Sequence, residues 1–236
     1  LGQTDMWVLE LAGGLSRRVT FSNAVWPRWS PDGKQLCYSN PGGIHRKAVD
    51  GSGEEELLMK VASIDWVQSV SPDGKVLLYG NTDIMMLPLT GEGKATAYLQ
   101  TKYTEAFATF SPDGRWVAYF SDESGRSEIY VQGFPERRGR WPVSAEGGRS
   151  PAWRADGKEL YWVGQDYTLM AASVELQAAG VRVLRTEALF RLLARDEQAH
   201  CRPSRDGRRF LVYEPEGALQ DRTMVVVQNW AARLGR

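Results

Sequence analysis

The sequence predicts an all-β fold, a β-propeller of four-stranded antiparallel blades, and three observations support this. First, an Asp-Gly pair recurs along the chain between two short apolar segments. Second, the aspartates of successive pairs lie 41, 40, 43 and 50 residues apart, a period that suits a four-stranded blade and is too long for a heptad or a leucine-rich repeat. Third, the repeats run nearly end to end without a linker rich in proline or serine, so we expect a single domain over residues 1–236.

The Asp-Gly pairs are typical of hairpin turns. Glycine supplies a positive φ, the aspartate accepts hydrogen bonds from the turn backbone, and a Lys or Arg follows on the solvent side. We therefore expect these aspartates to be structural turn residues. They are Asp32, Asp73, Asp113, Asp156 and Asp206.

The residues on either side of each turn alternate with period two, as half-buried strands do. In the first repeat the positions four and six after the aspartate are Leu36 and Tyr38, and the later repeats carry similar residues there. Three positions before the aspartate, large apolar residues such as Trp29 are expected to fill the gaps between blades. Only residues 187–194 hint at a helical turn.

The repeats divide the chain into one partial blade and the blades that follow it. They supply 21 strands, three short of six complete blades, so the sequence favours a six-bladed frame that lacks its first strands. A five-bladed closure, with residues 18–21 as the outer strand of the last repeat, is the alternative. An incomplete wheel exposes a sheet edge, through which we expect self-association. The expected blades are residues 1–23 (partial), 24–62, 63–103, 104–146, 147–195 and 196–236.

The composition argues against several classes of function. Lys plus Arg and Asp plus Glu both number 29, and this balance supplies no broad positive field for nucleic acid, so we expect no nucleic-acid partner. No stretch approaches the roughly 20 consecutive apolar residues that span a bilayer, so we expect no direct membrane insertion. Cys37 and Cys201 show neither disulfide-framework nor zinc-ligand spacing, which favours buried free thiols and predicts neither a metal nor a cofactor.

The sequence lacks the common catalytic motifs. It contains no nucleophile elbow, HExxH, P-loop, GxGxxG or EF-hand spacing. The two histidines, His45 and His200, fall in different repeats, and the run Glu54–Glu56 after Gly53 favours a solvated turn over a metal cluster. We therefore expect the chain not to be an enzyme.

A ligand site is expected at the axial funnel, where the innermost strands of the blades converge. Residues four or eight positions before each aspartate alternate with the packed aromatics, so they would face this axis together with other polar residues of the same strands. Their mixed charge favours a small polar ligand or a protein partner. The candidates are Arg28, Asp65, Glu105, Thr109, Arg149, His200 and Arg202.

Three of the turns extend to a longer motif. Residues 29–34 read WSPDGK, residues 71–75 read SPDGK, and residues 110–115 read FSPDGR. These segments resemble the signature of TolB-like, WD40-like propeller repeats, and the likeness covers almost the whole chain. Residues 121–132 and 223–230 resemble C-terminal propellers of bacterial multidomain proteins such as serine/threonine protein kinases. The last two repeats lack the proline of the motif and are the least typical.

The resemblance implies a non-catalytic module for protein interaction or ligand sensing in a larger bacterial protein. It also implies a periplasmic or other extracytoplasmic location. Two enzymatic alternatives stay open. TolB-like repeats form the propeller half of prolyl-oligopeptidase-type serine peptidases, although this chain lacks the βα alternation of their hydrolase domain. A polysaccharide lyase would use a histidine in the channel, for which His200 is the candidate.

Overall fold

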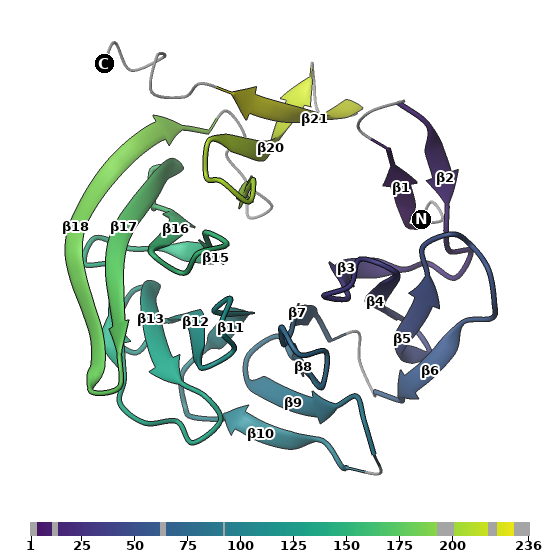
Figure 1. The fold of residues 1–236 in the computed structure, drawn as a ribbon, viewed down its shortest axis with the longest axis horizontal. Coiled ribbons are helices and arrows are strands. Elements are labelled where there is room, and N and C mark those ends of the chain that lie inside the picture. Colours follow the sequence, from purple (N-terminus) through teal and green to yellow (C-terminus); the bar gives the residue numbers. More distant parts are fainter. Residues whose placement is uncertain are drawn as a thin grey trace. The chain divides into compact units, whose positions relative to one another are not determined.

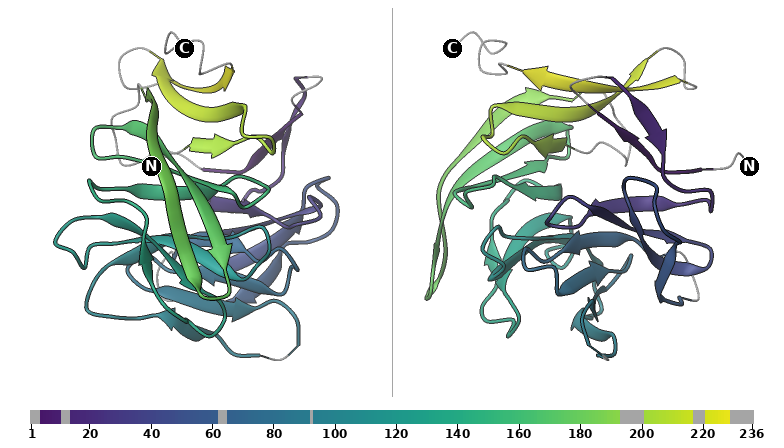
Figure 2. Two further views of the ribbon diagram at one scale, coloured as in Figure 1. Left: turned by 60° about the vertical axis from the view of Figure 1, so that its left-hand side comes forward. Right: turned by 45° about the vertical axis from the view of Figure 1, so that its right-hand side comes forward.

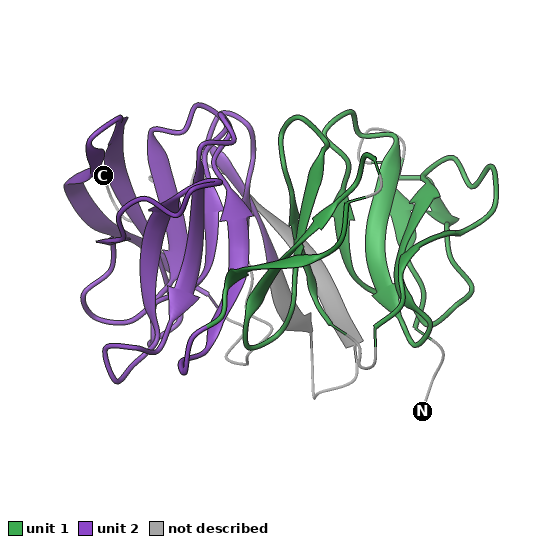
Figure 3. Cartoon of the chain, turned by 90° about the horizontal axis from the view of Figure 1, so that it is seen from below, with its two compact units in different colours: residues 1–100 green, residues 101–236 purple. Residues whose placement is uncertain are grey.

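The computed structural model describes residues 4–10, 14–61, 65–91, 93–192, 201–216 and 221–228, with side chains described as far as residue 212. Every regular element in these ranges is a β-strand (Figures 1 and 2). The chain forms two compact units, Leu1–Gln100 and Thr101–Arg236 (Figure 3). Within each sheet, strands that follow one another in the sequence lie side by side and pair antiparallel.

Unit 1 contains one two-stranded sheet and two four-stranded sheets. The short sheet pairs β1 (Trp7–Leu9) with β2 (Ser16–Arg18). The next sheet consists of β3 (Val25–Trp29), β4 (Gln35–Asn40), β5 (Gly43–Ala48) and β6 (Glu56–Met59). The third consists of β7 (Val67–Val70), β8 (Val76–Tyr79), β9 (Ile84–Pro88) and β10 (Thr96–Leu99).

Unit 2 contains two four-stranded sheets and one of three strands. The first consists of β11 (Glu105–Phe110), β12 (Trp116–Ser121), β13 (Glu128–Gly133) and β14 (Trp141–Pro142). The second consists of β15 (Arg149–Trp153), β16 (Glu159–Val163), β17 (Thr168–Gln177) and β18 (Gly180–Arg191). The third consists of β19 (Cys201–Pro203), β20 (Arg209–Glu216) and β21 (Asp221–Gln228).

The predicted all-β class and the four-stranded antiparallel sheets are confirmed. The 21 strands of the described ranges fall into sheets of two, four, four, four, four and three, as the repeats predicted. The number of blades and the single-domain organisation stay predictions. The hint of a helical turn was wrong for residues 187–191, because they belong to β18 and pair with β17, for example Ala188 with Met170.

The hairpin turns share one hydrogen-bond scheme. In the β3–β4 turn, Asp32 Oδ1 accepts a bond from Ser30 Oγ at 2.6 Å and one from the Lys34 N–H at 3.0 Å. Ser30 Oγ in turn accepts the Gln35 N–H at 2.9 Å. Because these bonds favour the ionised carboxylate, they lower the pKa of Asp32, the serine contributing most. The scheme recurs at Asp73, Asp113 and Asp206.

The β15–β16 turn reaches the same geometry with different chemistry. Arg154 stands where the other turns have serine, and its Nε and Nη2 donate to the two carboxylate oxygens of Asp156, both at 2.8 Å. The Arg154 guanidinium also forms an ion pair with Glu159 at 3.0 Å. The bonds from Arg154 are the main cause that lowers the pKa of Asp156. A charged side chain thus replaces a hydroxyl as the support of this turn.

The position three residues before the turn aspartate does not always fill a gap between sheets. Phe110 and Trp153 are buried, and Trp153 Nε1 donates to the Thr109 carbonyl of the preceding sheet at 3.3 Å. Trp29, by contrast, is 51% exposed, so the expectation was wrong there. Trp153 contacts β11, the first strand of the sheet that precedes its own. The sheet that precedes β3 has only two described strands, β1 and β2, and among the described residues it has no counterpart of β11 that could cover Trp29.

The hydrophobic cores lie between successive sheets within each unit. In unit 1, Ile44 of β5 packs with Leu77 of β8, and in unit 2, Leu169 of β17 packs with Phe210 of β20. Cys37 lies in the first of these cores and Cys201 in the second, both as buried free thiols, which confirms that prediction. Burial raises the pKa of Cys37 to about 11 and that of Cys201 to about 12.

Candidate functional site

The first strands of three sheets are interrupted at the same place by a β-bulge. In each bulge one residue other than glycine has a positive φ, a conformation that is uncommon for such residues. Each of these residues lies six positions before the turn aspartate of its repeat. They are Trp26 in β3 (57°), Phe107 in β11 (54°) and Ser150 in β15 (53°).

In unit 1 the structure brings the candidate Arg28 against the first strand of the next sheet. Arg28 Nε donates to the carbonyl of Gln68 in β7 at 2.6 Å, and Nη1 donates to the Pro27 carbonyl at 2.8 Å. Asp65 is half-buried just before β7, and its backbone carbonyl accepts a bond from Ser39 Oγ. The two candidates of this unit therefore lie at neighbouring strands, with Arg28 held by the backbone.

In unit 2 the candidates have dissimilar surroundings. Glu105, the first residue of β11, is only 2% exposed and accepts a bond from Thr101 Oγ1 at 2.6 Å. Thr109 is half-buried on the same strand. The guanidinium of Arg149 lies 4.8 Å from the centre of the Tyr167 ring, a cation–π contact. Arg202 is exposed on β19, and His200 lies outside the described residues.

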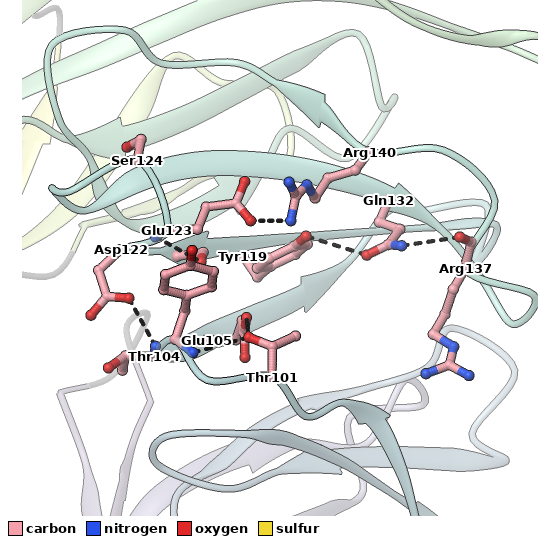
Figure 4. A network of polar contacts seen from close by, with 12 residues as sticks. Thr101, Thr104, Glu105, Tyr119, Asp122, Glu123, Ser124, Gln132, Arg137 and Arg140 are labelled. Carbon is pink, nitrogen blue, oxygen red and sulfur yellow. Dashed lines mark hydrogen bonds and ion pairs between the residues drawn. The ribbon is translucent and has the colours of Figure 1, made fainter.

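A polar network surrounds Glu105 on the sheet β11–β14 (Figure 4). The Thr104 N–H donates to Asp122 Oδ1 at 2.9 Å, and the Tyr119 hydroxyl donates to Gln132 Oε1 at 3.2 Å. Glu123 forms an ion pair with Arg140. These contacts fix the polar side chains of this sheet in one arrangement.

A second polar cluster in unit 1 was missed by the sequence. His45 Nδ1 lies 3.1 Å from Glu55 Oε1, which also accepts bonds from Asn40 Nδ2 at 2.7 Å and Ser22 Oγ at 3.2 Å. The Tyr38 ring stacks on His45, and burial together with Glu55 raises the pKa of its phenol. Glu55 is therefore a bonded residue and not part of a solvated turn, because side chains from three other chain segments converge on it. No spacing in the sequence signals this convergence.

A cleft of about 850 Å³ lies in unit 2. The β11–β12 turn and the β15–β16 turn form one side of it, and the end of β17 with Leu184 of β18 forms the other. A smaller cleft of about 410 Å³ contains the Tyr130 ring and the buried carboxylate of Glu128. Glu128 is held there by Arg126 at 2.5 Å and by the Gly147 N–H at 2.9 Å. Neither cleft was predicted from the sequence.

Within the described ranges, no group of three or more His, Cys, Asp and Glu side chains is placed to hold a metal ion. In the same ranges, we find no helix of the length and apolarity that a membrane crossing requires.

Comparisons with known proteins identify the fold. No family model matches the chain. Over 148 residues it is 27% identical to the uncharacterized protein Atu1656 of Agrobacterium fabrum, a match that covers 58% of this chain and 49% of that protein. TolB from Acinetobacter baumannii superposes with a TM-score of 0.75 at 18% identity, over 94% of this chain and 56% of TolB. The chain thus spans about half the length of these two proteins.

Two further solved structures share the architecture. A putative TolB from Agrobacterium tumefaciens has a TM-score of 0.62 at 21% identity, over 80% of this chain and 76% of that one. Oligogalacturonate lyase in complex with manganese has a TM-score of 0.65 at 16% identity, over 97% and 68%. At such identities the likeness concerns the fold alone. The chain therefore has the fold of a TolB-like β-propeller, which its turn motifs predicted.

Proposed function

We propose that this chain is a non-catalytic module that binds a protein partner or a small polar ligand at the bulged first strands of its sheets. The observation that carries the proposal is the repeated bulge with one positive φ. Backbone strain of this kind costs on the order of 1–3 kcal/mol per residue and clusters at functional sites. Bulges also re-aim side chains.

The bulges keep their geometry while their side chains differ. The three positions hold a tryptophan, a phenylalanine and a serine, Trp26, Phe107 and Ser150. Within unit 2, the first strands of two successive sheets thus display an aromatic and a hydroxyl side chain on the same backbone frame. Arg28 and Arg149 lie within two residues of these positions and add charge for a polar ligand.

The wider setting follows from the same proposal. The fold likeness to TolB supports an interaction module, and the turn motifs resemble propellers of larger bacterial proteins. We infer a role as one domain of such a protein, in the periplasm or elsewhere outside the cytoplasm, with no cofactor.

Site-specific photo-crosslinking in the source organism tests the proposal. A photo-reactive phenylalanine analogue replaces Trp26, Phe107 or, as the control, the exposed Leu15. We expect a discrete crosslinked species from positions 26 and 107 and none from position 15. In parallel, a thermal-shift screen of small polar compounds is run on the chain and on Arg28→Ala and Arg149→Ala. Equal crosslinking at all three positions, together with thermal shifts that both variants retain, would contradict the proposal.

A further inference from the structure

The β17–β18 ribbon continues beyond the sheet to which it belongs (Figures 1 and 2). β17 has 10 residues and β18 has 12, whereas β16 has five. β17 pairs with β16 only over Leu169–Ser173, and the last bond on that side runs from the Val174 N–H to the Lys158 carbonyl at 2.9 Å. From Glu175 onward, β17 pairs with β18 alone among the described strands.

The projecting part of the ribbon is fixed against the preceding sheet of unit 2. Val174 is buried, and Leu176, Val181 and Val183 pack against the same cluster, which contains Trp116. At the tip, Gly180 lies so close to Trp141 that an added Cβ would be 2.6 Å from the indole. The ribbon is therefore held in place without a partner, and its edge is pre-organised.

One edge of this ribbon is open. Backbone N–H and C=O groups of alternate residues point to the same side of a strand. Since the Val174 N–H points toward β16, the N–H and C=O of Leu176 point the same way, where no described strand pairs with them. This edge, Ser173–Gln177, forms one wall of the 850 Å³ cleft. The volume is within the range of about 300–1,000 Å³ found for ligand sites.

The charged residues that line the cleft are four carboxylates and three cations, and among them only Lys158 is outside an ion pair with a described residue. Its four carboxylates are each held by an arginine: Asp113 by Arg115 at 2.8 Å, Asp156 and Glu159 by Arg154, and Glu175 by Arg182 at 2.6 Å. Lys158 also lines the cleft, is exposed, and forms no ion pair with any residue that the structure describes. Leu184, 51% exposed, supplies an apolar surface.

We propose that this cleft binds an extended peptide segment of a protein partner, which adds a strand to the free edge of β17. Main-chain hydrogen bonds to Leu176 would supply affinity, and side-chain contacts would supply specificity. An acidic side chain of the peptide meets Lys158, and an apolar one meets Leu184. This surface is separate from the bulged first strands and goes beyond the function proposed for them.

The probe for the test is a phage-displayed library of random 12-residue peptides, selected on the chain. The enriched peptides are synthesised, and their affinities are measured by fluorescence polarisation. Leu176→Pro removes the free N–H without removing a bond to β18, and proline is tolerated at such an edge. Its control, Leu176→Ala, keeps the N–H. Lys158→Glu reverses the charge, and its control, Lys158→Arg, keeps it.

We expect Leu176→Pro and Lys158→Glu each to weaken binding by about tenfold or more, since each removes a contact of roughly 1.4 kcal/mol or more. The two controls should stay within about threefold, and melting temperatures show that all variants fold. Arg28→Ala should leave the affinity unchanged, which separates this site from the bulged strands. Peptides that bind the proline variant as well as the original chain would overturn the proposal. Sedimentation that shows self-association lost in Leu176→Pro would also overturn it, because a second copy would then occupy the edge.

Discussion

The first strands and the β17–β18 ribbon of this chain relate to the repeat in opposite ways. β3, β11 and β15 have five or six residues and carry their bulges at one position of the repeat. β17 and β18 are longer than every other described strand, and they occur in the repeat whose spacing to the next aspartate is 50 residues. The repeat therefore builds a frame, whereas a departure from it builds a surface that occurs once among the described strands.

We expect the largest difference in the free energy of unfolding between a variant of a core residue in the repeat and a variant of an exposed residue in the ribbon. Leu160 of β16 is fully buried, so Leu160→Ala should lower the free energy of unfolding by about 2–5 kcal/mol through the cavity that it leaves. Leu184→Ala on the ribbon should change it by less than about 0.5 kcal/mol. Urea denaturation measures both. Similar losses would mean that the ribbon is part of the core.

A substitution at the tip of the ribbon should lower the free energy of unfolding nearly as much as one in the core. Gly180 has a φ of +146° and no room for a Cβ beside Trp141, so Gly180→Ala should cost about 3 kcal/mol. Gly51, with a φ of +78° and nothing within 4 Å, is the matched control, and its alanine variant should cost about 1 kcal/mol. Equal costs in the same denaturation experiment would show that the contact with Trp141 does not hold the ribbon.

Variants of Arg154 compare the stability that arginine and serine give to the hairpin turn. Arg154→Ala removes the bonds to Asp156 and should cost about 1 kcal/mol. Arg154→Ser should cost less, because a serine here can form the contacts that Ser30 makes with Asp32. The difference between the two denaturation midpoints measures how well one chemistry substitutes for the other. A serine variant as unstable as the alanine variant would refute the equivalence.

The smallest expected effect is on the loss of stability at acidic pH. The bond from Ser71 Oγ is the main cause that lowers the pKa of Asp73 below its ordinary value of 3.8. As the pH falls below about 4, the unfolded chain takes up a proton before the folded chain does, so stability present at neutral pH is lost. Asp73→Asn and Ser71→Ala should both flatten the fall of the urea midpoint between pH 5 and pH 3, relative to the unchanged chain. Parallel curves for all three proteins would contradict this assignment.

Much of the fold was predictable because its signals are local. The turn aspartates, their glycines and the alternating strands are set by neighbouring residues, and their period gave the strand content of each sheet. The exposure of Trp29 was not predictable, because it depends on what the preceding sheet offers. Residues 187–191 became strand because β17 pairs with them, which overrides a weak local pattern.

The sites were less predictable than the fold. The sequence could place Arg28 on a first strand, but not its bond to the carbonyl of Gln68 forty residues away. Glu55 gathers His45, Asn40 and Ser22 from separate segments, and no spacing rule joins them. The cleft beside β17 exists because β16 begins only at Glu159, opposite Ser173, and leaves the rest of β17 without a partner on that side, a fact of pairing and not of composition.

The two buried cysteines can report the local opening of each unit. One thiol lies in the core of each unit, Cys37 in unit 1 and Cys201 in unit 2, and burial keeps both protonated and out of reach of alkylating reagents. Reaction with iodoacetamide therefore requires local opening, and its rate reports how often each unit opens. Peptide mapping of the alkylated chain would show which of the two units opens first, without an introduced cysteine.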